Sequence, residues 1–219
     1  MDLPPDPTLD EMRAALAPLI ARNAAFDGWG DAALVAAAGE LGLPVEQARL
    51  AYPDGAAGMI DAWFAQIDAR LAADFPPDRI AAMKIRDRIT ALVRQRIEIA
   101  MPQRDALQRA LAILAQPQNI ARGVKLGWRS ADTMWRIAGD TATDFAHYTK
   151  RVTLAGVYGA TLLAFLDDES EGHTETWAFL DRRIEGVMRF EKLKQQIKGQ
   201  PGHRLSLSRF LGRLRYPAT

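Results

Sequence analysis

Cysteine is absent from this 219-residue chain. Its absence excludes disulfide scaffolds, thiol nucleophiles, iron–sulfur clusters and cysteine-ligated zinc sites. Histidine is scarce, with three residues in all, and no Glu-x-x-His motif occurs, which also excludes a di-iron carboxylate bundle. The sequence has no P-loop, no G-x-G-x-x-G loop and no G-x-S-x-G elbow. We therefore predict no catalytic residue, no metal and no cofactor, and a protein that is not an enzyme.

One acidic cluster could in principle bind a cation or supply an acid/base pair. It lies between two segments with helical periodicity. We interpret it as a solvated loop followed by acids that favour the start of the next helix. Its members are Asp167, Asp168, Glu169, Glu171 and Glu175.

Long hydrophobic runs are also missing. The longest uncharged run, Val152 to Leu166, has 15 residues. As a helix it would span roughly 22 Å, short of the ~30 Å core of a bilayer, so a buried helix is the better interpretation. The first ten residues, MDLPPDPTLD, have neither the basic and apolar regions of a signal peptide nor the composition of a transit peptide.

The charge is nearly balanced overall, with 28 basic and 27 acidic residues, but it is unevenly distributed. Residues 192–219 contain seven basic residues and no acid, which leaves an acidic body. The segment HRLSLSRFLGRLRY within this tail has an apolar stripe at helical spacing, flanked by arginines. We predict an amphipathic helix over 203–214 that binds a membrane surface through Leu207, Phe210, Leu211, Leu214, Arg204, Arg209 and Arg213.

The remaining pattern is helical almost throughout, and no stretch alternates with period two. We therefore predict an all-α protein with N-terminal helices over 8–72 and a helical ligand domain over 77–198. The Thr8–Glu11 capping box predicts a first helix from about residue 9. Later helices are expected near 31–39, after Pro44, and over 56–72, 77–100, 104–115, 118–138, 141–166 and 173–198.

The first 65 residues resemble the helix-turn-helix portion of the tetracycline-repressor (TetR) fold. A ligand-responsive transcription regulator is therefore an alternative function. Between Asp27 and Phe64, however, Arg49 is the only basic residue, against six acids. Because DNA affinity depends on neutralising phosphates, we expect no nucleic-acid binding and a helix-turn-helix that is vestigial.

Small residues are interspersed along the apolar segment 141–166: Ala155, Gly156, Gly159, Ala160 and Ala164. Such residues allow close helix packing or leave room for an apolar ligand. The residues alone leave both interpretations open, and a purely structural helical partner protein without a ligand also remains possible.

A longer motif is more specific. The run MWRIAGDTATDFAHYTKR (134–151) and the run TWAFLDRR (176–183) closely resemble the coenzyme Q biosynthesis protein nine family, with likeness over most of residues 10–198. The resemblance implies a TetR-like bundle that binds isoprenoid ubiquinone precursors and presents them to the demethoxyubiquinone hydroxylase at the membrane. We expect the lipid pocket to include Trp135, Phe145, Val152, Tyr158 and Leu162.

The family's partner-contact patch, carried over by position, falls on Met134, Asp144, His147 and Tyr148. At one of these positions the chain departs from eukaryotic members, which have Trp where this chain has His147. The resemblance also implies a homodimer, by analogy with the fold. Without a transit peptide the chain looks like a bacterial member, cytoplasmic and peripheral on the inner membrane, whereas eukaryotic relatives lie on the matrix side of the mitochondrial inner membrane.

Overall fold

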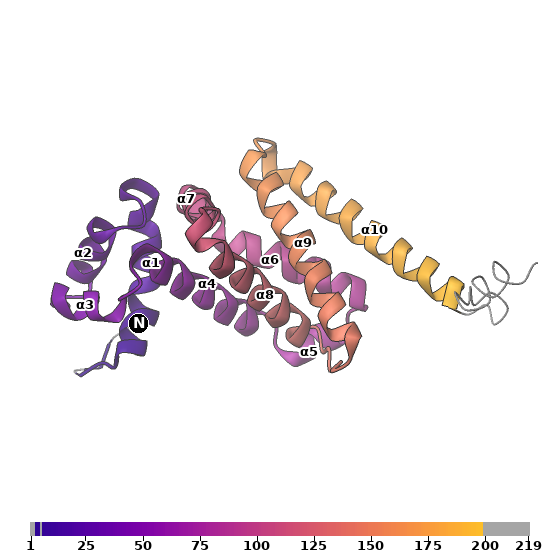
Figure 1. Cartoon of the computed structure of the whole chain (residues 1–219), viewed down its shortest axis with the longest axis horizontal. Helices are drawn as coiled ribbons and strands as arrows, with labels where there is room; N and C mark the ends of the chain where they lie inside the picture. Colours follow the sequence, from indigo (N-terminus) through magenta and orange to yellow (C-terminus); the bar gives the residue numbers. More distant parts are fainter. Residues whose placement is uncertain (1–2, 5, 199–219) are drawn as a thin grey trace, which may run out of the picture. The chain divides into compact units, whose positions relative to one another are not determined.

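The computed structural model describes residues 3–4 and 6–198, with side chains to residue 190. Within these residues it contains ten α-helices and no strand, which confirms the all-α prediction (Figure 1). The helices are α1 (Leu9–Asp27), α2 (Asp31–Glu40), α3 (Val45–Ala51), α4 (Gly55–Asp74), α5 (Pro77–Ala81), α6 (Ile85–Ala100), α7 (Arg104–Leu114), α8 (Ile120–Ile137), α9 (Phe145–Asp167) and α10 (Thr174–Lys198).

Local signals in the sequence fix the first helix. Thr8 and Glu11 form the expected capping box, with Glu11 N–H donating to Thr8 Oγ1 at 3.3 Å and Thr8 N–H donating to the Glu11 carboxylate at 2.8 Å. Gly28, with φ +76°, ends the helix in a conformation that favours glycine. The next residue, Trp29, is buried and donates its indole N–H to the Ala106 carbonyl at 2.8 Å. The turn after α1 is thereby attached to α7.

Residues Met1–Asp181 form one compact unit. In it α1 packs on α2, α3, α4 and α7, and α4 packs in turn on α6 and α8. Helices α8 and α9 run side by side in opposite directions (Figure 1). The alanine-rich faces of α1 and α2 bury small side chains, so these two helices approach closely. The second unit is Arg182–Thr219, in which the helix continues to Lys198.

The single helix expected over 77–100 is wrong, because the chain breaks between α5 and α6. Lys84 is extended, with ψ 153°. The guanidinium of Arg88 donates to the carbonyls of Ala81 (3.1 Å) and Met83 (2.8 Å), which the break leaves without helical partners, and to Ala138 (2.8 Å). A contact 50 residues away along the chain therefore stabilises the interruption, and helical periodicity alone cannot show it.

The interpretation of the acidic cluster between α9 and α10 as solvated is wrong for one residue, Asp168. Asp168 is 4% exposed. Its carboxylate accepts the amide and hydroxyl of Ser170 (2.8 and 2.6 Å) and the amide and hydroxyl of Thr176 (2.8 and 2.6 Å). Burial by itself would raise the pKa of Asp168, but these hydrogen bonds outweigh it and hold that pKa well below its ordinary value.

Asp168→Ala should lower the free energy of unfolding by about 3 kcal/mol, because it leaves the buried Thr176 groups without an acceptor. The loss is measured by urea unfolding at pH 7, with the exposed neighbour change Asp167→Ala as control, expected within about 0.5 kcal/mol of wild type. Since the folded pKa is depressed, the contribution of Asp168 is fully present above the unfolded pKa of about 3.9 and declines as the pH falls below it. If the difference in free energy of unfolding between wild type and Asp168→Ala were the same at pH 2 as at pH 7, the stabilising role of the Asp168 carboxylate would be contradicted.

Candidate functional site

A pocket of about 460 Å³, open to solvent on one side, lies among α4, α7, α8 and α9. We call it the α8–α9 cavity. Its lining contains no charged side chain. The lining residues are Phe64, Leu111, Leu114, Ala115, Ile120, Gly123, Val124, Gly127, Ser130, Ala155, Tyr158, Gly159 and Leu162. Its size and apolar wall are typical of a small-molecule site.

Glycines on facing helices create this space. A Cβ atom built on Gly127 of α8 or on Gly159 of α9 would meet no atom within 4 Å. Gly123 has a different role, because its Cβ would lie 3.3 Å from the Leu114 carbonyl, so it allows α8 to approach α7 closely. The small residues at 127 and 159 thus leave room, while the one at 123 permits packing.

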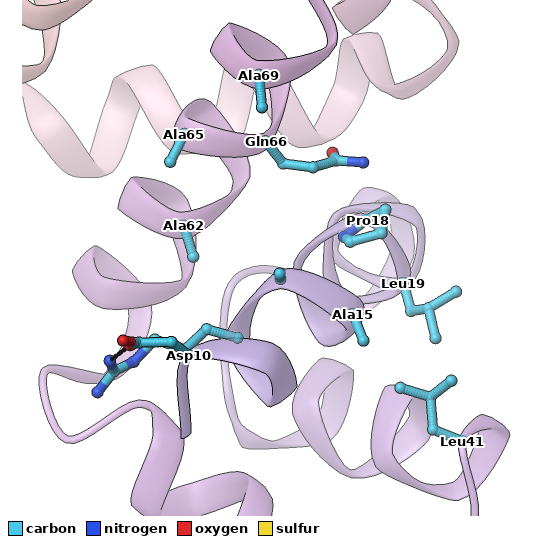
Figure 2. A pocket seen from close by; sticks show the side chains of 11 residues that line it. Asp10, Ala15, Pro18, Leu19, Leu41, Ala62, Ala65, Gln66 and Ala69 are labelled. Carbon is cyan, nitrogen blue, oxygen red and sulfur yellow. Dashed lines mark hydrogen bonds and ion pairs between the residues drawn. The ribbon is translucent and has the colours of Figure 1, made fainter. Parts of the chain in front are cut away.

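A second hollow, which we call the α1–α4 groove, has a volume of about 610 Å³. Figure 2 shows Ala62, Ala65 and Ala69 of α4 along one side and residues of α1 along the other. Asp10 and Arg13, paired at 2.6 Å, also line it, so part of its wall is charged. A long hydrocarbon therefore fits the α8–α9 cavity better, because that lining would leave no charged group desolvated.

Behind the cavity wall lies a buried charged cluster. Arg96 of α6 is fully buried, donates from Nε to Asp68 Oδ1 at 2.9 Å and donates from Nη1 to the Tyr158 hydroxyl. Burial raises the pKa of Tyr158, an effect that Arg96 partly opposes. Burial would by itself lower the pKa of Arg96, but Tyr158 and Asp68 raise it, so Arg96 stays charged.

Of the five residues predicted to line a lipid pocket, two line the α8–α9 cavity and three do not. Tyr158 and Leu162 line the α8–α9 cavity. Trp135, partly buried, is outside its lining and donates its indole N–H to the Lys150 carbonyl at 3.1 Å. Phe145 and Val152 are 81% and 62% exposed, so the prediction that they line this pocket is wrong.

The physical reason lies in the composition of α9. Phe145 and Val152 lie on an exposed face of this helix. Its buried residues are Arg151, Leu154, Val157, Tyr158, Thr161, Leu162 and Phe165. Because α9 is apolar on more than one side, several three- and four-residue repeats run along it. Packing against α8, and not the repeat itself, decides which of them is buried.

The predicted partner patch is divided by the fold. Met134 is fully buried, which contradicts its assignment to a contact surface. Asp144 is exposed and caps α9 by accepting the Ala146 amide at 3.0 Å. His147 is partly buried, and Tyr148 is 58% exposed.

Trp128 joins this patch, although no pattern in the sequence pointed to it. Its ring centre lies 6.0 Å from that of Tyr148 and 6.4 Å from that of His147. The three rings form an aromatic cluster across α8 and α9. A Trp 20 residues before Tyr148 gives no local signal, since only the antiparallel pairing of the two helices brings these residues together.

Charged residues of the long motif hold the turn between α8 and α9. Arg151 is buried and pairs with Asp132 at 2.6 Å and Asp140 at 3.1 Å, while Lys150 pairs with Asp140 at 2.6 Å. Burial would raise the pKa of Asp140, but the hydrogen bonds from Lys150 and Arg151 lower it overall. These motif residues position the end of α9 that carries the aromatic cluster.

The only basic residue between Asp27 and Phe64, Arg49, is engaged in ion pairs. Arg49, on α3, pairs with Asp31 at 2.8 Å and Glu46 at 2.7 Å. The position that would face DNA in a helix-turn-helix therefore offers an arginine that is already neutralised.

The predicted membrane residues, Leu207, Phe210, Leu211, Leu214, Arg204, Arg209 and Arg213, lie outside the described residues. In the part of the chain that the structure describes, no group of His, Asp and Glu side chains is placed to hold a metal ion. No helix among those described is long and apolar enough to cross a membrane.

The helix order and packing define a class of protein, the TetR-like all-α fold. The structure resembles that of a TetR transcriptional regulator from Nitrosomonas europaea with a TM-score of 0.64 and 22% identity, covering 80% of this chain and 96% of that one. At this identity the likeness establishes the fold and nothing of the regulator's function.

Sequence comparison identifies the particular relatives. Residues 120–191, which hold most of the α8–α9 cavity and the aromatic cluster, match the COQ9 family model. The chain is 33% identical over 178 residues to the rat ubiquinone biosynthesis protein COQ9, 28% over 195 to the Drosophila melanogaster protein and 37% over 106 to the human protein. These matches cover 78%, 87% and 48% of this chain. The chain is thus similar to COQ9 proteins, as the resemblance predicted.

The shared region is a part of each relative. The chain spans 57% of the rat protein, 60% of the fly protein and 33% of the human protein.

Proposed function

We propose that this protein acts in ubiquinone biosynthesis as a non-catalytic lipid carrier. It takes a polyprenylated ubiquinone precursor into the α8–α9 cavity and presents the precursor to the demethoxyubiquinone hydroxylase at the membrane. The observation that carries this proposal is an uncharged cavity of about 460 Å³ that lies mostly within the segment matching COQ9. The names of the relatives supply the pathway.

Native mass spectrometry of the protein expressed in a ubiquinone-producing host tests the carrier function. A co-purifying isoprenoid, identified by its fragmentation, is the expected result. An apo spectrum from protein purified without detergent would overturn the proposal.

The basic tail should bring the carrier to an anionic membrane. In liposome flotation, removal of residues 203–219 should abolish binding, because four large apolar side chains contribute roughly 1.5–3 kcal/mol each. A variant that keeps the tail but loses three of its charges carries Arg204→Gln, Arg209→Gln and Arg213→Gln. It should bind anionic vesicles about 100-fold more weakly, because each arginine contributes roughly 1 kcal/mol. Its binding to neutral vesicles should be unchanged. Undiminished flotation of the truncated chain would contradict a role for the tail.

The aromatic cluster of Trp128, His147 and Tyr148 is the surface we propose for the hydroxylase. Tyr148→Ala should weaken a pull-down of that enzyme at least tenfold, since exposed aromatic anchors dominate interface energies. Leu163→Ala, an equally exposed apolar change further along α9, serves as control and should have no effect. Equal loss in both variants would argue against a specific patch.

A ligand-responsive transcription regulator is the second candidate, favoured by the TetR-like fold. The pairing of Arg49 with two acids opposes it. Heparin chromatography of the chain lacking residues 203–219 separates the two functions, because the regulator would be retained at ~100 mM salt through its N-terminal helices and the carrier would not.

A further inference from the structure

Arg96 lies directly behind the wall of the α8–α9 cavity. Its Cζ atom is 4.7 Å from the centre of the Tyr158 ring and 5.4 Å from the centre of the Phe64 ring. Both rings line the cavity. The buried guanidinium of Arg96 is therefore separated from the apolar cavity only by the side chains of Phe64 and Tyr158.

One nitrogen of the Arg96 guanidinium makes no hydrogen bond within the described residues. Nε and Nη1 are engaged by Asp68 and Tyr158, whereas Nη2 has no hydrogen-bond partner among the described residues. Asp68 Oδ2 makes no hydrogen bond either, and lies 3.5 Å from Arg129 Nε as an ion pair of poor geometry. A fully buried N–H group without an acceptor is costly and rare, and calls for an acceptor that arrives with a ligand or with water.

We propose that Arg96 recognises the polar head of the guest in the α8–α9 cavity. An oxygen of the head, a ring carbonyl or phenol oxygen, accepts the Nη2 hydrogen between the rings of Phe64 and Tyr158. The hydrocarbon tail fills the remaining space and leaves past Ile120 and Val124, which line the cavity and are 52% and 68% exposed. This inference rests on the proposed function and narrows its ligand class to oxygen-bearing prenylated or alkylated rings, inserted head first.

Two probes with the same tail test the proposal. Decylubiquinone has a ring with oxygen acceptors, and decylbenzene has a ring without them. Binding of each is measured by native mass spectrometry to wild type and to the double variant Arg96→Met/Asp68→Leu, which leaves no unpaired buried charge. We expect decylubiquinone to bind wild type at least about tenfold more tightly than it binds the variant, and decylbenzene to bind both within about twofold.

If the double variant does not fold, a second variant, Arg96→Lys, still tests the proposal. Arg96→Lys keeps the charge, but one ammonium cannot serve Asp68, Tyr158 and a guest with a guanidinium's geometry. It should lose part of the preference for decylubiquinone and leave decylbenzene binding unchanged. Equal binding of the two probes by wild type overturns the inference and leaves the carrier function standing. Wild type that binds neither probe overturns the carrier function, and the inference with it.

Discussion

Gly159→Phe should abolish lipid retention while leaving the protein at least as stable as wild type. Gly159 lines the α8–α9 cavity, and a Cβ at this position would meet no atom within 4 Å. The phenyl ring would occupy space that the tail needs. Displacing on the order of 100 Å² of buried hydrocarbon costs about 3 kcal/mol, or roughly a 100-fold loss of affinity.

Stability should move in the opposite direction from binding. Replacing a helical glycine removes its entropic penalty of about 1 kcal/mol, and the new ring packs into an existing void. Urea unfolding of Gly159→Phe should therefore show a midpoint equal to or above that of wild type. The combination of tighter folding and lost binding separates a filled cavity from a damaged fold.

The control is Gly156→Phe, one turn earlier on α9. Gly156 is exposed, its Cβ would also meet no atom within 4 Å, and it is outside the cavity lining. It receives the same ring on the same helix and should retain lipid as wild type does. Retention by Gly159→Phe, or equal loss in both variants, would show that the α8–α9 cavity is not the lipid site.

Arg96→Met should lower the free energy of unfolding by about 3–5 kcal/mol, because it leaves the buried carboxylate of Asp68 without its principal partner. The double variant Arg96→Met/Asp68→Leu should recover most of this loss, since well-packed apolar residues replace a buried pair at little cost. Urea unfolding of the single and double variants gives the coupling between the two residues.

An exposed ion pair provides the comparison. Arg94 and Glu98 pair at 2.8 Å on α6 with half and a third of their side chains exposed, so Glu98→Gln should change stability by less than about 0.5 kcal/mol. A similarly small effect of Arg96→Met would mean that Arg96 and Asp68 are not tightly coupled, and that the cluster is hydrated.

Both predictions concern one wall of the same cavity. Gly159 supplies volume, while Arg96 supplies the charge behind the rings that line it. A carrier for a molecule with a long hydrocarbon and a small polar ring needs both properties. Their position in and next to the segment matching COQ9 is the reason we propose this cavity, and not the α1–α4 groove, as the lipid site.

The sequence by itself determined the features that neighbouring residues control. The capping box at Thr8, the start of α2 at Asp31 and the glycine-rich turns set the helix ends, so nearly all helices were predicted within a few residues. The motif over 134–151 was long enough to identify the COQ9 relatives, and the acidic composition around Arg49 spoke against DNA binding before any contact was known.

Tertiary structure alone decided which helix faces are buried and which distant residues meet. Met134 was assigned to the surface and is buried, while Phe145 and Val152 were assigned to the pocket and are exposed, because the packing of α8 on α9 selects one apolar stripe among several. The break before Ile85 depends on Arg88 reaching Ala138, and the charged cluster depends on Arg96 reaching Asp68 and Tyr158. Contacts between residues 28 to 62 positions apart leave no periodic trace in a single sequence, so only the folded chain reveals them.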